Sequence, residues 1–231
     1  MINEKSPVDR AVLNNAVWCG IVCDTHGIPH VSTRDAWGTR GQAPLYYPDI
    51  VTLSRDATAE EIHRFAEGRA ISSIKDSYAN LDLESSGYRV LFEAEWICHE
   101  PVPFAEPLSA SWRRVATPEV LSRWNAANGT DTIIRPELLG RDDLNLFIRE
   151  NDGGRSGFIA SLGGGAVGVS NVFAADTPDE RLWAEITALA SMEYPGLPIV
   201  GYERGEDLKA ALGAGWTSVG PLRVWVRQVE Q

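Results

Sequence analysis

Cysteine and histidine, the residues most often used for nucleophilic and metal chemistry, are few in this chain and widely spaced. Cys19 and Cys23 lie one helical turn apart, so they form either a metal or redox pair or two small residues of a hydrophobic core. We favour the core, because no other Cys/His pair has ligand spacing. The histidines are scattered at His26, His30, His63 and His99. The sequence therefore predicts no metal site.

The sequence motifs of the common enzyme classes are also missing. The chain contains no G-x-S-x-G, no H-E-x-x-H, no G-x-x-x-x-G-K-[ST] and no dinucleotide-binding fingerprint after a strand. Hydrolase, kinase and metalloenzyme functions therefore have no support. Carboxylates remain as candidates. Glu93 and Glu95 share one face of a predicted strand, where they either line an amine pocket or are simply exposed, and Glu203 is either catalytic or a solvated carboxylate at a helix start.

Composition limits the class of protein. With 231 residues, 44% of them hydrophobic, the chain is long enough for one large domain or two small ones. The formal charge of -11 argues against nucleic acid or an anionic membrane surface as the main partner but tolerates a cationic or amine substrate. No apolar run approaches the ~18 residues of a membrane span. The first residues, MINEKSPVDR, lack the core of a signal peptide, and we expect a cytoplasmic protein.

The C-terminal stretch contains the elements around the last of these carboxylates. Leu197–Tyr202 is a short apolar run typical of a buried strand. Residues Gly205–Leu212 switch to helical spacing, and Gly213 and Gly215 end that helix. After Gly220–Pro221 the apolar residues alternate again, as in a strand. The stretch therefore predicts strand, helix, a Gly-Trp pair and strand.

This order, with Gly215-Trp216 closing the helix and a strand behind it, resembles the C-terminal part of the GNAT superfamily, the acyl-CoA-dependent N-acyltransferases. The resemblance covers most of the chain and is best from about Asp143 to Arg227. It implies an α/β fold with a GNAT-like mixed sheet flanked by helices. It also implies transfer of an acyl group from acetyl-CoA or another acyl-CoA to a small amine.

The second half of the chain predicts most elements of such a fold. It reads as a capped helix (Thr117–Gly129), three strands (Leu144–Arg149, Gly157–Leu162 and Ala166–Ala174) and a helix (Pro178–Met192) before the C-terminal stretch. The helix Pro178–Met192 carries one apolar stripe, formed by Leu182, Ile186, Leu189 and Met192. We assign this stripe to the core rather than to cofactor binding.

The first half predicts a similar plan with fewer strands. Its elements are a helix from Ser6-Pro7 to about Gly27, an aromatic loop (Ile28–Pro48), a strand (Asp49–Ser54), a helix from the capping box at Thr58 to Gly68, and strands at Ile71–Lys75 and Arg89–Ile97. The loop either borders a pocket or covers the core.

The two halves also share short sequence matches. Asp82-Leu83 followed by Gly87-Tyr88 corresponds to Asp207-Leu208 followed by Gly215-Trp216. This correspondence predicts an internal duplication, with residues 1–105 as a reduced GNAT-like half and residues 106–231 as a more complete one. Pro101, Pro103 and Pro107 indicate an extended linker between them.

The cofactor loop departs from the family pattern. In GNAT enzymes a glycine-rich loop and a helix N-terminus hold the pyrophosphate of coenzyme A with backbone N–H groups. Here the corresponding stretch after Ser170 reads NVFAADTPDERLW, without glycine, and the acidic residues around the helix start are Asp176, Asp179 and Glu180. Each charge repels a diphosphate by about 1 kcal/mol in water. The resemblance implies that the pantetheine arm binds backbone groups of Val167, Gly168, Val169, Ser170 and Asn171.

The proton-transfer residues depart as well. In many GNAT enzymes a Tyr four residues before the Gly-aromatic pair protonates the departing thiolate, and here that position is Ala211, or Leu83 in the first half; Arg204 replaces an Asn that often precedes the Tyr. The resemblance places Glu203 and Tyr202 where the sheet splays for the acyl group, with Glu203 as candidate base. Two functions remain: an N-acyltransferase with an altered cofactor loop, or a catalytically degenerate GNAT-like protein that binds a ligand or partner in the same cleft.

Overall fold

The computed structural model describes residues 5–103, 112–151 and 154–228. The chain forms two compact units: unit 1 comprises Met1–Asn15 and Trp96–Val219, and unit 2 comprises Ala16–Glu95 and Gly220–Gln231. Helix α1 (Pro7–Thr25) and strands β5 (Tyr88–His99) and β11 (Thr217–Arg227) each begin in one unit and end in the other. The predicted boundary between residues 105 and 106, and with it Pro107 of the linker, lies outside the described residues and stays a prediction.

Besides the end of β5 and the start of β11, the described part of unit 1 contains five strands. They are β6 (Trp112–Arg114), β7 (Leu144–Asn151), β8 (Gly154–Gly163), β9 (Ala166–Phe173) and β10 (Ile199–Glu203). Their order is β5-β10-β9-β8-β7-β6. The pairs from β6 to β9 are antiparallel, whereas β9 and β10 run parallel. The three strands predicted before the Pro178–Met192 helix are thereby confirmed, and β6 was missed because it is only three residues long.

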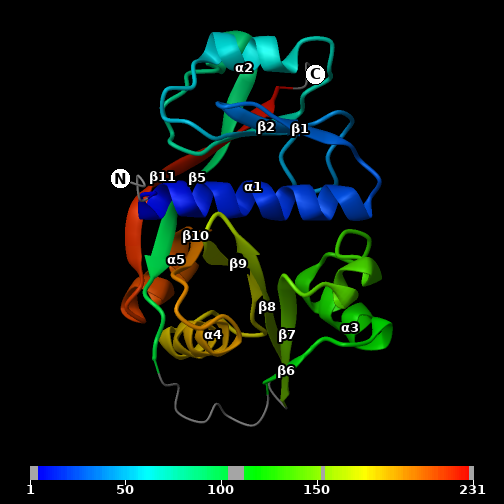
Figure 1. The fold of residues 1–231 in the computed structure, drawn as a ribbon, viewed down its shortest axis with the longest axis vertical. Helices are drawn as coiled ribbons and strands as arrows, with labels where there is room; N and C mark the ends of the chain where they lie inside the picture. Colours follow the sequence, from blue (N-terminus) through cyan, green and yellow to red (C-terminus); the bar gives the residue numbers. More distant parts are fainter. Residues whose placement is uncertain (1–4, 104–111, 152–153, 229–231) are drawn as a thin grey trace. The chain divides into compact units, whose positions relative to one another are not determined.

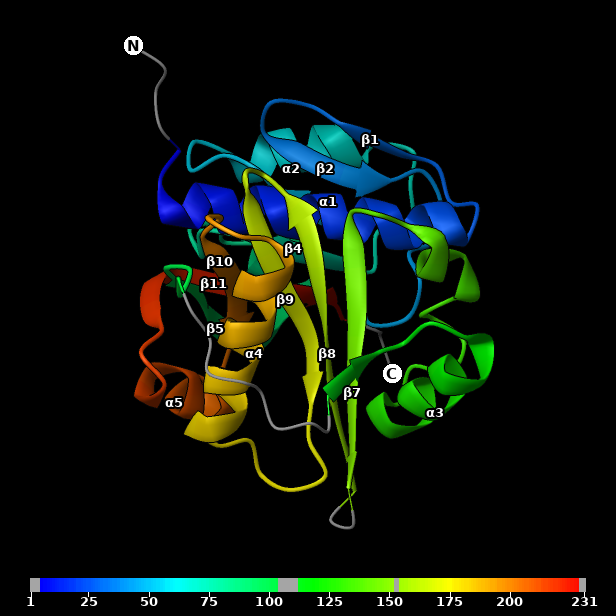
Figure 2. The ribbon, with the colours of Figure 1, turned by 60° about the horizontal axis from the view of Figure 1, so that its bottom comes forward.

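Four helical segments accompany these strands: α3 (Pro118–Asn128), η2 (Pro136–Gly140), α4 (Glu180–Glu193) and α5 (Gly205–Gly213). Figures 1 and 2 show α3 beside β7 and β8, and α4 beside α5. On β8, Phe158 packs into the core with α4 and α5, while a Cβ at the adjacent Gly157 would lie 2.6 Å from Nε1 of Trp124 on α3. Because successive strand residues point to opposite faces, α3 and α4 cover opposite faces of the sheet.

The first part of α1 also packs on the α3 face of unit 1. The amide Nδ2 of the buried Asn14 donates to the carbonyl oxygens of Ser161 (3.0 Å) and Ala166 (3.3 Å). Gly168 faces this side chain, and a Cβ at Gly168 would collide with the Asn14 amide. The glycine therefore allows a buried polar contact between helix and sheet beside the last hydrogen-bonded pair of β9 and β10.

Unit 2 has strands in the order β1-β2-β3-β4-β11-β5, where β1 is His30–Ser32, β2 Ala36–Thr39, β3 Ile50–Thr52 and β4 Ser73–Asp76. Strands β3 and β4 are parallel. Helix α2 (Ala59–Ala66) begins at the predicted capping box, in which Thr58 and Glu61 satisfy each other's backbone N–H groups. Its Ile62 is buried with Ile50 and Trp225 in the core of this unit.

The predicted secondary structure needs three corrections. The region Ile28–Pro48 is not all loop, since it contains β1 and β2, which are too short to show alternation. Helix α4 is capped by Asp179 and begins after Thr177-Pro178. Met192, assigned to the apolar stripe, is 57% exposed. The protein is nevertheless a mixed α/β fold with a large mixed sheet flanked by helices, as predicted, and none of its described helices is long and apolar enough to cross a membrane.

Candidate functional site

Strands β9 and β10 diverge after a short parallel ladder. Ile199 lies opposite Val167 and Val200 opposite Gly168, and the ladder ends there, although β9 continues to Phe173 and β10 to Glu203. Gly201 maintains a close approach just beyond the ladder, because a Cβ at this position would lie 3.0 Å from the carbonyl oxygen of Val169. The backbone beyond this point is therefore released from one strand neighbour. Such a strand edge can hydrogen-bond an extended ligand.

Near this divergence, a β-bulge changes the direction of β9. Gly157 of β8 pairs with Phe173, whereas Ile159 pairs with Ser170, so two steps along β8 correspond to three along β9. Asn171 is the residue with left-handed backbone (φ 53°), which Asn tolerates better than most residues. Its side chain accepts from Asn128 Nδ2 on α3 (3.5 Å). The bulge is a local distortion of the kind that often adjoins an active site.

The five residues predicted to bind a pantetheine arm are thus not equivalent. Val167 and Gly168 lie in the ladder, and the N–H of Val167 donates to Pro198 at 2.9 Å. Val169, Ser170 and Asn171 lie beyond it, at the divergence and the bulge. Val169 directs its backbone groups toward β10, as Val167 does, whereas Ser170 directs its own toward Ile159 of β8. Backbone groups on the β10 side beyond the ladder can therefore meet a ligand, a distinction that alternation in the sequence does not reveal.

Glu203 ends β10 on the face covered by α4 and α5. Ile199, which shares this face by alternation, packs in one core cluster with Ala210 and Ala211 of α5. Glu203 is partly buried. Its pKa is raised to about 8, mainly by loss of solvent and also by the carboxyl of Asp207 in the first turn of α5, while Arg204 opposes this shift. A carboxyl that titrates near neutral pH is suited to proton transfer.

Tyr202 points to the opposite face of the sheet. Its ring packs edge-on against Trp96 of β5, with centroids 5.4 Å apart and planes at 80°. The structure therefore does not bring the two predicted catalytic side chains together: Glu203 faces α5, and Tyr202 lies on the α3 face with Trp96. Trp96 was not assigned to the site from the sequence.

The start of α4, where the family pattern predicts a pyrophosphate, is already occupied by its own side chains. Asp179 is the N-cap, and its Oδ1 accepts the N–H of Leu182 at 2.8 Å. Pro178 has no N–H to offer. The structure therefore confirms the acidic helix start that the sequence indicated, and the residues present do not fit a diphosphate.

Other candidates fall outside this region. Cys19 and Cys23 are buried in unit 2 beside Trp37, as the core interpretation predicted, and burial raises the pKa of their thiols to about 11 and about 12. Among the described residues no group of three His, Cys, Asp or Glu could hold a metal ion. Glu93 forms a surface ion pair with Arg223, with its Oε1 2.7 Å from Nη2.

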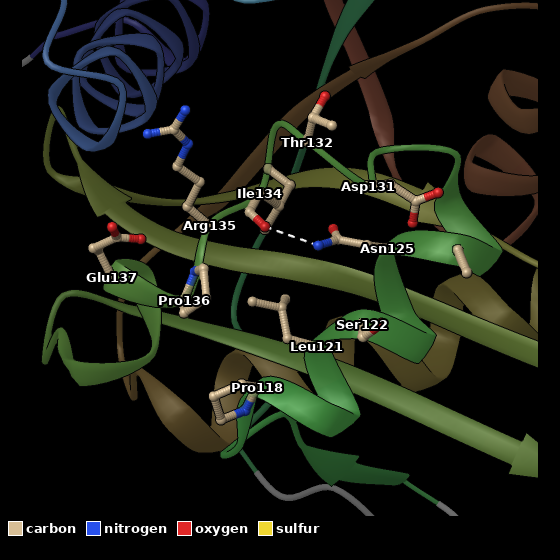
Figure 3. A pocket seen from close by; sticks show the side chains of 11 residues that line it. Pro118, Leu121, Ser122, Asn125, Asp131, Thr132, Ile134, Arg135, Pro136 and Glu137 are labelled. Atoms are coloured by element: carbon tan, nitrogen blue, oxygen red, sulfur yellow. Dashed lines mark hydrogen bonds between the residues drawn. The ribbon is translucent and has the colours of Figure 1, made fainter.

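A groove of about 790 Å³ lies between α3 and residues 131–137 (Figure 3). Leu121 and Pro136 line its middle, and Asn125 donates to the carbonyl oxygen of Ile134 at 2.8 Å, which ties the two walls together. The polar side chains do not converge, because Arg135 and Glu137 lie at one end and Asp131 at the other. This groove is a less specific candidate than the β9–β10 divergence.

Comparison with known proteins agrees with the fold. No protein-family model and no curated sequence matches the chain. A GCN5-related N-acetyltransferase from Kribbella flavida is 15% identical, with a TM-score of 0.60 over 94% of this chain and 96% of that chain. A putative GNAT-family acetyltransferase from Novosphingobium aromaticivorans is 11% identical, with a TM-score of 0.58 over 97% and 100%. A protein of unknown function from Staphylococcus epidermidis is 8% identical, with a TM-score of 0.58 over 86% and 93%. The chain therefore has the GNAT fold, in a divergent form.

Proposed function

We propose that unit 1 transfers an acyl group from an acyl thioester, such as acetyl-CoA or another acyl-CoA, to a small amine. The observation that carries this proposal is the divergence of β9 and β10, with a bulge on β9 and, at the end of β10, the carboxyl of Glu203, whose pKa is raised to about 8. The GNAT fold supports the reaction class, since this fold houses acetyltransferases among the structural neighbours.

The reaction assigns separate tasks to the two strands. Backbone groups of Val169–Asn171 hold the thioester arm as an added strand would be held. The lone pair of the amine forms a bond to the thioester carbonyl carbon, and the C–S bond breaks with its electron pair on sulfur. The ionised carboxylate of Glu203 takes the proton that the nitrogen loses, and one proton ends on the sulfur. The products are an amide and a free thiol.

Tyr202 has a different task because it faces the other side of the sheet. Together with Trp96 it presents an aromatic surface, and such a surface can attract an ammonium ion. We therefore assign Tyr202 no part in proton transfer. An acceptor that arrives as an ammonium ion must lose one proton to solvent before its nitrogen lone pair can attack. The net charge of -11 is compatible with a cationic acceptor.

The test is a screen for acyl transfer. Purified protein is incubated with acetyl thioesters and a panel of small amines, and both thiol release and the mass of the amide are followed. Amine-dependent thiol release with an amide product supports the proposal. The absence of amide from every pair contradicts it.

One specific observation favours a second function, a GNAT-like protein that binds without catalysis. The position of the family's proton-donating Tyr is Ala211, which is fully buried and accepts the N–H of Trp216 through its carbonyl oxygen at 3.1 Å. For such a protein we expect an acyl thioester or its thiol product to raise the melting temperature without turnover. Binding and turnover measured on one preparation separate the two functions.

A further inference from the structure

Beyond the Asp179 cap, further charged side chains surround the start of α4. The carboxylate of Glu180 lies against Gly213 of α5, where a Cβ would collide with it. A shallow groove of about 440 Å³ runs between the two helices and is lined by both signs of charge. The acidic side chains in and beside it therefore decide whether it can accept an anion.

The cations of this groove are engaged by carboxylates. Lys209 Nζ lies 2.7 Å from Glu206 Oε1, and Arg181 Nε lies 3.5 Å from Glu185 Oε1. A diphosphate would have to displace these partners and approach Asp179 and Glu180 as well. Both steps oppose binding, since like charges repel and each broken ion pair loses its attraction.

The region where β9 and β10 diverge favours a neutral ligand instead. The side of Val169–Asn171 that faces β10 offers neutral backbone groups, and the amide-rich pantetheine arm of a thioester is itself neutral. We propose that unit 1 recognises its donor by the acyl-pantetheine arm alone, so that its donor class is an acyl-pantetheine thioester that needs no nucleotide diphosphate. This inference rests on the proposed acyl transfer at the same site.

The experiment compares acetyl-CoA with S-acetyl-pantetheine as donors to one amine, at low and at moderate ionic strength, and compares binding of the two thiol products by calorimetry. We expect kcat/KM for S-acetyl-pantetheine to equal or exceed that for acetyl-CoA. Added salt should improve only acetyl-CoA, because screening weakens repulsion. A preference for acetyl-CoA of about tenfold or more, or binding of coenzyme A that weakens with salt, overturns the inference.

A charge-neutralising variant sharpens this test. Asp179→Asn with Glu180→Gln removes two charges but keeps the cap, because Asn is as good an N-cap as Asp. We expect a severalfold gain in coenzyme A affinity and no change for pantetheine. A loss of coenzyme A affinity in this variant contradicts the inference. The control, Glu60→Gln with Glu67→Gln, removes two charges from α2 and its C-cap and should change neither affinity.

The two proposals fail in different ways. If neither thioester binds or reacts, the proposed acyl transfer fails, and the donor class fails with it. If both react but acetyl-CoA is strongly preferred, acyl transfer stands and only the donor class is wrong.

Discussion

The parallel strand pairs of the two units begin alike and end differently. In unit 2, Ile50 lies opposite Ile74 and Val51 opposite Lys75, the same two-residue ladder that joins β9 and β10 in unit 1. Beyond it, the N–H of Ser77 donates to Oγ1 of Thr52 at 2.8 Å, so a side chain replaces the missing ladder bond. In unit 2 a side-chain hydrogen bond therefore joins the two strands beyond the ladder, whereas in unit 1 the two strands diverge there.

The residues past each ladder explain this difference. Unit 2 has Asp76, whose buried carboxylate accepts the N–H of Leu81 at 2.9 Å, and then Ser77. Unit 1 has Gly201, then Tyr202 and Glu203. The first set satisfies its own backbone, whereas the second presents an aromatic ring and a carboxyl to opposite faces. The proposed active site is placed in unit 1 for this reason.

The largest expected effect is on activity in unit 1. Glu203→Gln removes the proton acceptor, and we expect acyl transfer to fall by about 100-fold or more. With a weakly basic acceptor that is uncharged at neutral pH, wild-type kcat/KM should rise with pH toward a plateau above an apparent pKa of about 8, since Glu203 must be ionised to act as base. The variant should lose this dependence. Glu60→Gln on α2 serves as control, and an unchanged rate in Glu203→Gln removes this residue from the mechanism.

Two positions of helix α1 compare the units in stability. Asn14→Ala leaves buried carbonyl oxygens of unit 1 without their donor, and we expect a loss of about 2–3 kcal/mol in the free energy of unfolding. Cys19→Ala removes a buried thiol from unit 2 and should cost about 1 kcal/mol. Denaturant unfolding measures both. Equal losses would contradict the polar role of Asn14.

The same Glu203→Gln change should also alter stability in a pH-dependent way. The folded carboxyl keeps its proton up to about pH 8, above the ordinary value of 4.5, so folding is stabilised at low pH and loses that contribution as pH rises toward 8. Gln has no such loss. Allowing about half of the shift at about 1.4 kcal/mol per pKa unit, we expect the variant to be more stable by about 2 kcal/mol at pH 8.

Melting curves across pH provide the check. The two proteins should have the same melting temperature near pH 4 and separate progressively above it. Parallel curves at all pH values would show that Glu203 is solvated in the folded protein, which is the alternative that its position at a helix start left open.

The smallest expected effect is on the free energy of unfolding, at the hydrogen bond between Ser77 and Thr52 in unit 2. Thr52→Val keeps the shape of the side chain but removes the acceptor for Ser77, and we expect a loss of about 1–2 kcal/mol. Acyl transfer by unit 1 should not change. A loss of activity larger than the loss of folded protein would show that the β3–β4 pair also belongs to the active site.

The predicted duplication has one further structural correlate. The N–H of Tyr88 donates to Leu83 at 3.2 Å and that of Trp216 donates to Ala211 at 3.1 Å, and the glycine before each aromatic residue has a positive φ, 79° at Gly87 and 93° at Gly215. This recurrence is what a duplication would leave. The duplication itself stays a prediction, which superposition of the two strand sets tests.

Much of the fold could be predicted because the signals are local. The capping box at Thr58 and the strand predicted at Arg89–Ile97 depend on residues close together in the chain, and the structure contains both. Strands β1 and β2 were missed because three or four residues carry no periodicity, and they are held by pairing with other strands.

The same distinction between local and long-range signals applies to the candidate site. The sequence by itself determined that Glu203 follows a buried strand, that Ala211 stands at the family's Tyr position and that the start of α4 is acidic, since these follow from neighbours in the chain. Only the tertiary structure decided that the ladder ends at Gly168, that Asn171 forms a bulge, and that burial raises the pKa of Glu203. Pairing and burial arise from segments distant in sequence, and no local pattern records which strand stops pairing or which carboxyl loses its water.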